Sequence, residues 1–161
     1  MSEESKCVIT IQSFVSHPND VASRMRMLHG GFEEVQHGVR EGYVRKAQDG
    51  TKRCLESLHE LNDSCVRREW SPLIWEPDEL ETWEGLMGAR NLSHHSGAHI
   101  VRMGEDESGN TLTWSTDRVA LDRLWIQSQA VAFKLRVDGH PVIPMLARMA
   151  SLIEISLAPP D

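Results

Sequence analysis

The sequence has no apolar segment long enough to form a membrane-spanning helix. Such a helix needs about 20 consecutive apolar residues, and the 161-residue chain contains no run of this kind. Its first residues, MSEESK, are acidic and polar, whereas a secretory signal begins with basic and then apolar residues. We therefore predict a cytoplasmic protein that does not bind membranes.

Cysteine is scarce, with three residues in no paired spacing. An odd, unpaired set of this kind excludes the disulfide framework of a small secreted domain. Cys54 and Cys65 fall in a segment of helical periodicity, where their separation is about 16 Å along the helix axis, too far for a disulfide. We expect them to be small core residues.

Short catalytic and cofactor-binding motifs are also missing. The chain contains no Gly-x-Ser-x-Gly, no phosphate-binding Gly-x-x-x-x-Gly-Lys, no Gly-x-Gly-x-x-Gly and no Cys-x-x-Cys. Because active sites can be built without such motifs, these absences count against an enzyme but leave the question open. We predict no cofactor.

The negative charge is concentrated in one quarter of the chain. The whole protein has a net charge of −7, and residues 70–110 hold eight acids and two bases, a net charge of −6. Bases cluster in RKAQDGTKR, residues 45–53, where Arg45 and Lys46 are equally well explained as cations at a helix C-terminus. An acidic total with no concentrated basic patch argues against direct nucleic-acid binding.

Length and periodicity predict an α+β fold, a mainly helical single domain over residues 1–161 with residues 1–5 disordered. Residues 7–15, CVITIQSFV, alternate as a β-strand does. Residues 98–115 contain two short strand patterns on either side of the polar loop GEDESGN, which predicts a hairpin. The expected small antiparallel sheet therefore consists of this N-terminal strand and the hairpin.

The first helical region, residues 21–66, predicts an antiparallel helix pair. We place the turn between its helices at Gln48–Thr51, where the letters are QDGT. The glycines at 30, 31, 38 and 42 are each expected to weaken the first helix by about 1 kcal/mol. A further helix is predicted to start at Pro77, since proline suits the first helical position and acids follow it.

The chain ends in two predicted helices, residues 116–137 and 141–157. The first of these has two apolar faces. One face comprises Leu121, Leu124, Trp125, Ala132 and Leu135. On the opposite face lie Ile126, Phe133 and Val137. A helix that is apolar on two sides is either enclosed within its domain or packed against another chain, so these three residues are a candidate homodimer interface.

The acidic run WEPDELETWE combines carboxylates with two tryptophans. Tryptophan supplies contact area at low entropic cost, and carboxylates steer a basic partner toward the surface. The alternative is an ordinary amphipathic helix in which Leu80, Trp83 and Met87 face the core and the acids are solvated. The candidate partner-binding residues are Trp75, Asp78, Glu79, Glu81, Trp83 and Glu84.

The segment NLSHHSGAHI contains the candidate metal ligands His94, His95 and His99. On one helix His95 and His99 could share a zinc ion, but Ser96 and Gly97 interrupt the helical pattern. In an extended segment the two histidines would be about 13 Å apart, too far to converge easily. We therefore expect His94 and His95 to be exposed at the entry to the hairpin, and His99 to pack toward the core.

Two Glu-x-x-His pairs, Glu34 with His37 and Glu56 with His59, also have the spacing of metal ligands on a helix face. On helical wheels, both pairs point away from the apolar stripe of their helix. They therefore resemble a solvated face rather than the interior of a metal-binding bundle.

Together these features favour a small acidic intracellular protein that binds another macromolecule, as inhibitor, immunity and adaptor proteins do. The expected partner is a protein with a basic surface, steered by the acidic surface near residues 75–84. The alternative is a metal-dependent enzyme that uses the histidine cluster.

Overall fold

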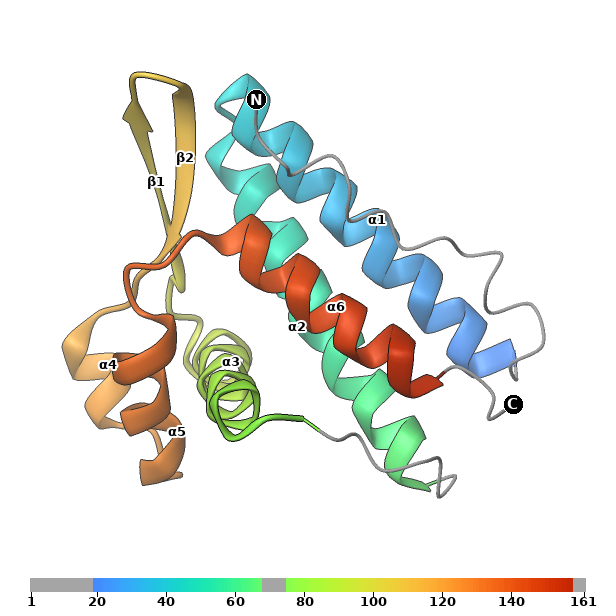
Figure 1. Cartoon of the computed structure of the whole chain (residues 1–161). Helices are drawn as coiled ribbons and strands as arrows, with labels where there is room; N and C mark the ends of the chain where they lie inside the picture. Colours follow the sequence, from blue (N-terminus) through green and yellow to red (C-terminus); the bar gives the residue numbers. More distant parts are fainter. Residues whose placement is uncertain (1–18, 68–74, 158–161) are drawn as a thin grey trace.

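The computed structural model describes residues 19–67 and 75–157 and has a mainly helical α+β fold (Figure 1). In chain order the elements are α1 (Asn19–Glu41), α2 (Val44–Arg67), α3 (Pro77–Ser96), β1 (Val101–Asp106), β2 (Gly109–Trp114), α4 (Arg118–Asp122), α5 (Gln127–Ala132), the π-helical segment η3 (Phe133–Val137) and α6 (Val142–Leu157). The predicted fold class is therefore confirmed. The predicted strand at residues 7–15 lies outside the described residues.

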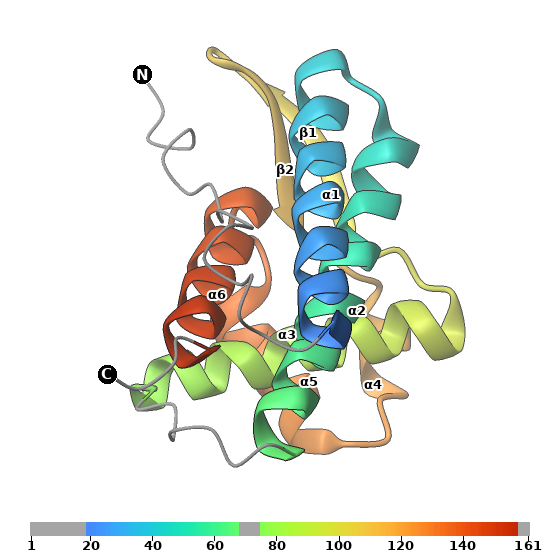
Figure 2. The same ribbon diagram turned by 90° about the vertical axis from the view of Figure 1, so that its right-hand side faces the viewer.

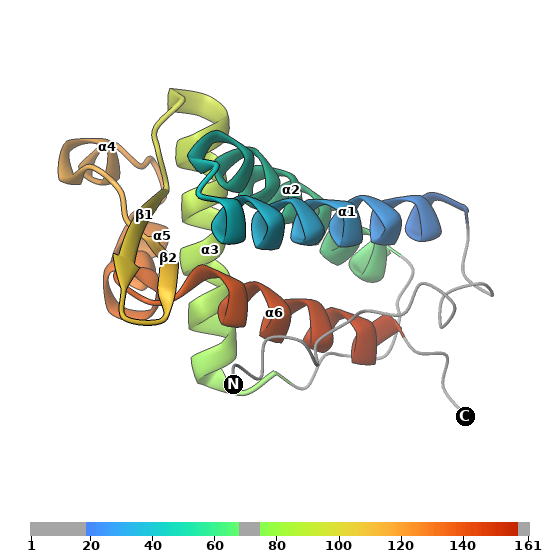
Figure 3. The ribbon, with the colours of Figure 1, turned by 90° about the horizontal axis from the view of Figure 1, so that it is seen from above.

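Helix α3 occupies the middle of the fold. It lies across one end of the group formed by α1, α2 and α6, and the α4–α5 segment packs on its other side (Figures 2 and 3). Within the described ranges, every helix is too short or too polar to span a lipid bilayer. Cys54 is fully buried in the core, as predicted, and burial raises the pKa of its thiol.

The predicted helix pair is present, but its turn lies at Gly42–Tyr43 and not at Gln48–Thr51. Gly42 has φ of +73°, a left-handed conformation that glycine adopts at low cost. The amide of Tyr43 then donates to the carbonyl of Gly38 at 2.8 Å and closes the end of α1. Residues 48–51 lie inside α2, where the Thr51 hydroxyl donates to the Ala47 carbonyl at 2.7 Å.

Glycine allows α1 and α2 to pack unusually closely. A Cβ atom added at Gly50 would be 2.8 Å from the Gly31 carbonyl oxygen and 2.9 Å from the Val35 nitrogen. One added at Gly38 would be 2.7 Å from the Ala47 nitrogen. Glycine at these positions lowers the intrinsic stability of each helix, but it also lets the two helix backbones come into close contact.

The predicted hairpin is confirmed, with a tighter loop than the sequence suggested. β1 and β2 pair in antiparallel register from Val101 with Trp114 to Asp106 with Gly109, leaving two residues in the turn. The Asp106 carboxylate accepts from the amide of Ser108 at 2.8 Å and from its hydroxyl at 2.6 Å. These hydrogen bonds favour the charged carboxylate and lower the pKa of Asp106.

This turn predicts a measurable pH effect. A carboxyl group whose pKa is lowered by folding stabilises the native turn above its unfolded pKa, and this contribution is lost as pH falls through the folded pKa. Replacing Ser108 with alanine removes the hydroxyl, the largest cause of the shift, and should raise the pKa of Asp106 toward its ordinary value. An NMR titration of the Asp106 carboxyl carbon measures this, and an unchanged midpoint would contradict the assignment.

The long helix predicted for residues 116–137 is wrong: the chain forms α4, a turn at residues 123–126, α5 and η3. The Asp117 carboxylate accepts from the Val119 amide at 3.1 Å and so caps the start of α4. Because the helix is interrupted, the side chains after the break no longer follow the 100° spacing that starts in α4. As a result, Leu124 and Phe133 are both buried, although a continuous helix would place them on different faces.

The proposed homodimer interface through Ile126, Phe133 and Val137 is therefore incorrect. Phe133 and Val137 lie in the core, and Ile126 lines a cleft beside α3. Small residues on α3 admit this packing, because a Cβ added at Gly85 would be 2.7 Å from the Cγ2 of Val137. Two of the three residues, Phe133 and Val137, are buried within the protein's own fold, whereas Ile126 is 38% exposed.

Candidate functional site

The histidine segment forms the C-terminal end of α3 and is not the entry to the hairpin. The helix continues to Ser96 and stops at Gly97, whose φ of +64° gives the left-handed conformation that commonly ends a helix. The amide of Ala98 donates to the Leu92 carbonyl at 3.3 Å and completes this cap. The sequence pattern predicts an interruption of the helix at Gly97, and in the structure this glycine marks the helix end.

His94 and His95 are exposed, as predicted, but His99 is exposed as well, contrary to the prediction. Strand alternation predicts a buried His99, but β1 begins only at Val101. Alternation therefore does not apply at residue 99. The Nδ1 atom of His99 lies 3.3 Å from the Nε2 atom of Gln48 on α2.

The structure does not bring the three histidines together into a group of metal ligands. Across residues 19–67 and 75–157, no group of three or more histidine, cysteine, aspartate or glutamate side chains lies close enough to hold an ion. The His94 and His95 rings pack edge to face with centroids 4.9 Å apart. Histidine 94 contacts Glu56 at 3.6 Å from Nδ1 to Oε1. The metal-enzyme alternative has no support from this geometry.

The two Glu-x-x-His pairs are likewise used in structural contacts. Glu34 forms an ion pair with Arg53 across the α1–α2 interface. Glu56 accepts from Arg90 of α3, with 3.0 Å from Nε to Oε1 and 3.2 Å from Nη2 to Oε2. These two carboxylates connect neighbouring helices.

The tryptophans of the acidic run belong to the core and its margin. Trp75 is only 7% exposed. Its ring packs against Trp83 in an edge-to-face arrangement with centroids 5.3 Å apart, and Trp83 is itself packed on the core. Neither indole projects freely toward a partner.

The acids of this run contact C-terminal residues of the same chain. Arg136 bridges two of them, with 3.0 Å from its Nη2 to Asp78 and 2.5 Å from its Nε to Glu81. The hydrogen bond to Glu81 and the charge of Asp78 raise the pKa of Arg136. Arg148 also forms an ion pair with Glu79, with 3.7 Å from Nη2 to Oε1. The Ser128 hydroxyl donates a hydrogen bond to the Glu84 carboxylate at 2.5 Å. Part of the acidic excess is therefore offset within the molecule.

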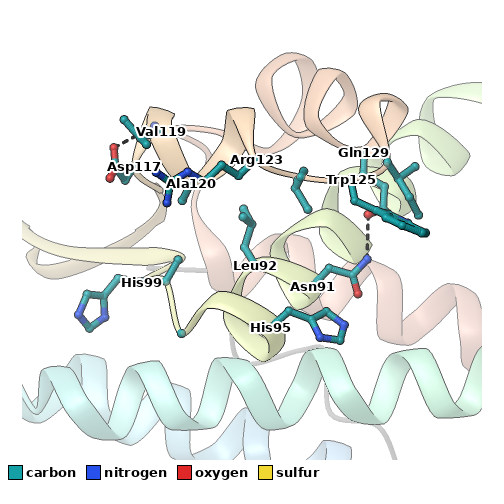
Figure 4. Close-up of a pocket in the computed structure, with 14 residues that line it drawn as sticks. Asn91, Leu92, His95, His99, Asp117, Val119, Ala120, Arg123, Trp125 and Gln129 are labelled. Atoms are coloured by element: carbon teal, nitrogen blue, oxygen red, sulfur yellow. Dashed lines mark hydrogen bonds between the residues drawn. The ribbon is translucent and has the colours of Figure 1, made fainter.

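A cleft that the sequence did not reveal lies between the C-terminal half of α3 and the α4–α5 segment (Figure 4). We call it the α3–α5 cleft, and its volume is about 820 Å³. One wall is the C-terminal half of α3 with residues 97–99, and the other is the α4–α5 segment. The lining residues are Asn91, Leu92, His95, Gly97, Ala98, His99, Asp117, Val119, Ala120, Arg123, Leu124, Trp125, Ile126 and Gln129.

Trp125 is the most distinctive residue of this cleft, because it is 91% exposed. It projects from the turn between α4 and α5 (Figure 4). The apolar periodicity predicts it on the buried face of one long helix, but the helix break exposes its side chain. The run Leu124-Trp125-Ile126 was the available signal, since a helix cannot direct three consecutive apolar residues to one face.

A fixed amide network forms part of the cleft wall. The Asn91 side-chain amide donates to the Gln129 side-chain oxygen at 2.8 Å, and Arg90 donates to the Asn91 oxygen at 3.1 Å. Gln129 is buried. Because both partners of Asn91 hold its amide in place, this wall is organised before any ligand arrives.

A second hollow of about 530 Å³ adjoins the cleft. It lies between the start of α2 and the base of β1, and it shares His99 and Asp117 with the cleft. The two hollows are therefore neighbours, and we call the pair the β1–cleft groove. Its remaining lining residues are Val44, Gln48, Val101, Arg102, Met103, Ser115 and Thr116.

Comparison with protein-family models, with curated proteins and with solved structures finds no match.

Proposed function

We propose that the protein acts by binding a protein partner in the α3–α5 cleft, as inhibitor and adaptor proteins do. The observation that carries this proposal is Trp125, 91% exposed beside an apolar cleft of about 820 Å³. Tryptophan is strongly enriched among the residues that dominate binding energy at protein interfaces. A protein keeps an indole fully in water at a cost that burial by a partner removes.

The shape of the groove supports a polymer as the ligand. The cleft alone has the volume of a small-molecule site, but a second hollow adjoins it, and His99 and Asp117 line both. Two adjoining hollows with apolar side chains along one end are suited to a segment of polypeptide chain. The ordered amides of Asn91 and Gln129 supply fixed polar groups against which such a segment is positioned.

The start of α3 is a second candidate surface, for the basic partner that the charge distribution suggested. Glu76, Asp78 and Leu80 are exposed there. The contacts of Arg136 and Arg148 with Asp78, Glu79 and Glu81 leave this surface less acidic than its sequence. It remains a candidate because most of the net charge of −7 comes from this part of the chain.

Substitutions in the α3–α5 cleft and at the start of α3 test which of the two surfaces binds the partner. Partners are captured from the native cell with the full chain, and the affinity of the recovered partner is then measured for Trp125→Ala, for Val131→Ala and for the double variant Glu76→Lys/Asp78→Lys. We expect Trp125→Ala to weaken binding by roughly 2 kcal/mol, about thirtyfold, as for other interface tryptophans. Val131 is the matched control, since it is exposed on α5 but does not line the cleft.

The outcomes distinguish the candidates clearly. Normal binding by Trp125→Ala together with loss of binding by the double lysine variant would move the site to the start of α3. Equal weakening by Trp125→Ala and Val131→Ala would point to a general effect on the α4–α5 segment. Thermal denaturation of each variant shows whether the fold is retained.

A further inference from the structure

The short helix α4 lies on the outside of the fold (Figures 1 and 3). Its inner side is anchored by Leu121, which is buried. Arg118, Val119 and Asp122 are exposed, and their positions fall within about 100° of one another around the helix axis. α4 therefore has one exposed face, on which an apolar residue lies beside two residues of opposite charge.

The charges of this segment are complementary to those of a second copy of itself. Residues 117–123 read DRVALDR, so an acid followed by a base stands at both ends. When two copies run antiparallel about a twofold axis through the middle of the segment, Asp117 lies opposite Arg123 of the other copy. In the same arrangement Arg118 lies opposite Asp122 of the other copy. Every charge then meets one of opposite sign, whereas parallel copies would place like charges opposite each other.

The surroundings of α4 leave this charge balance nearly intact. Residues 117–123 hold two acids and two bases and are neutral, in a chain of net charge −7. Asp122 also contacts Lys134 at 3.5 Å from Oδ1 to Nζ, but its side chain remains 61% exposed. The strand and turn acids Glu105, Asp106 and Glu107 lie toward the tip of the hairpin, far from α4 (Figure 1). A nearly neutral face attracts neither a strongly acidic nor a strongly basic partner, and two copies can meet there without strong repulsion.

Trp125 supplies the apolar part of this surface. It lies just beyond the end of α4 and is 91% exposed. In the antiparallel pair it would extend past the start of the other copy's α4, toward Ser115 and Thr116, which line the second hollow. Two tryptophans could together bury roughly 300–450 Å², about a quarter of the area of a standard specific interface. With Val119 and the charged residues of α4, they give a contact of the small, weakly binding class.

We propose that the partner is a second copy of this chain, bound by antiparallel pairing of the two α4 segments, with each Trp125 covering the β1–cleft groove of the other copy. The ion pairs of Asp117 with Arg123 and of Arg118 with Asp122 set the orientation and register of the two copies. Because the contact is small, the dimer forms at concentrations of about micromolar. This inference rests on the proposed function, because it places a protein partner at the same surface.

The test is charge reversal, with the dissociation constant of the dimer measured by sedimentation of the full chain. In Arg118→Asp both of the ion pairs nearest the axis become acid with acid, and in Asp122→Arg both become base with base. In an equimolar mixture of the two variants, a dimer with one copy of each again has an acid opposite a base at both positions. Arg26→Asp is the matched control, because it makes the same change of charge at an exposed residue of α1.

We expect Arg118→Asp and Asp122→Arg each to dimerise about tenfold more weakly than wild type, and their mixture to form a heterodimer of nearly wild-type affinity. Contacts within one chain cannot produce this recovery, because each chain in the mixture keeps its own substitution. Trp125→Ala should also weaken the dimer about tenfold, and Arg26→Asp should behave as wild type. Circular dichroism must show the same fold for all variants.

The remaining outcomes separate this inference from the proposed function. A full chain that stays monomeric up to about 100 μM would overturn the inference, and a different protein captured through Trp125 would then still support the proposed function. A dimer that neither reversal weakens would place the contact on another face and would likewise overturn the inference. Recovery in the mixture without any effect of Trp125→Ala would keep the α4 contact and remove the cleft from the proposed function.

Discussion

Replacing Gly50 with alanine should destabilise the protein by about 1–3 kcal/mol, the usual range for overpacking a closely packed interface. Helix propensity alone predicts the opposite sign, a gain of roughly 1 kcal/mol. The new methyl group would lie 2.8 Å from the carbonyl oxygen of Gly31 and 2.9 Å from the nitrogen of Val35. Both are backbone atoms, so they cannot move aside as a flexible side chain does, and the two helices must separate.

Gly30 provides the matched control, because it lies in α1 beside Gly31. A Cβ atom added at Gly30 has no neighbour within 4 Å outside its own helix backbone and adjacent residues. Gly30→Ala should therefore stabilise the protein by about 0.5–1 kcal/mol. The free energies of unfolding are measured by denaturant titration with far-ultraviolet circular dichroism. A stabilising effect from both substitutions would show that α1 and α2 are not in close contact at Gly50.

Replacing Phe133 with alanine should cost about 3–5 kcal/mol of folding stability, as for other large aromatic residues in a core. Phe133 is only 1% exposed and lies in η3, which packs against α3. A loss of this size is a large part of the 5–15 kcal/mol that typically stabilises a domain. The variant is expected to be partly or largely unfolded at physiological temperature.

Leu135 is the matched control, since it lies in the same π-helical segment and is 64% exposed. Leu135→Ala should change the free energy of unfolding by less than about 0.5 kcal/mol. Denaturant titration and sedimentation are measured on both variants. A Phe133→Ala variant that remained as stable as wild type but changed its oligomeric state would restore the interface assigned from the sequence.

Local sequence signals were sufficient where neighbouring residues decide the structure. Proline at 77 followed by acids correctly marks the start of α3, and strand alternation on either side of a polar loop correctly predicts the hairpin. The apolar spacing after Val142 also predicts α6, whose residues Leu146, Met149 and Ile153 are buried. Each of these signals acts within a few residues of chain, so no distant contact is needed to interpret it.

The errors occurred where one type of residue has several physically different roles. Glycine either weakens a helix, ends it in a left-handed conformation, or admits a neighbouring backbone, and the sequence does not distinguish these roles. Gly42 and Gly97 end helices, whereas Gly50 lies inside one against Gly31. The turn of the helix pair was misplaced because QDGT around Gly50 looks more like a turn than the residues at Gly42.

In the candidate site, too, local features could be predicted from the sequence but contacts between distant segments could not. The sequence identified unusual charge and unusual histidine content, but the ion pairs that use those charges join residues far apart in the chain, such as Arg136 with Glu81. The α3–α5 cleft depends on a helix break between Asp122 and Gln127, whereas the apolar periodicity predicted one continuous helix. Trp125 consequently changed from an expected core residue to the most exposed of the large apolar residues described.

By itself the sequence determined the fold class, the hairpin and the start of α3, because short-range backbone preferences and apolar periodicity specify these features. Only the tertiary structure decided which charges are paired, which apolar face is covered and where a partner has access. The reason is physical: burial and electrostatic pairing depend on contacts between segments, such as α3 with η3, that no local pattern encodes.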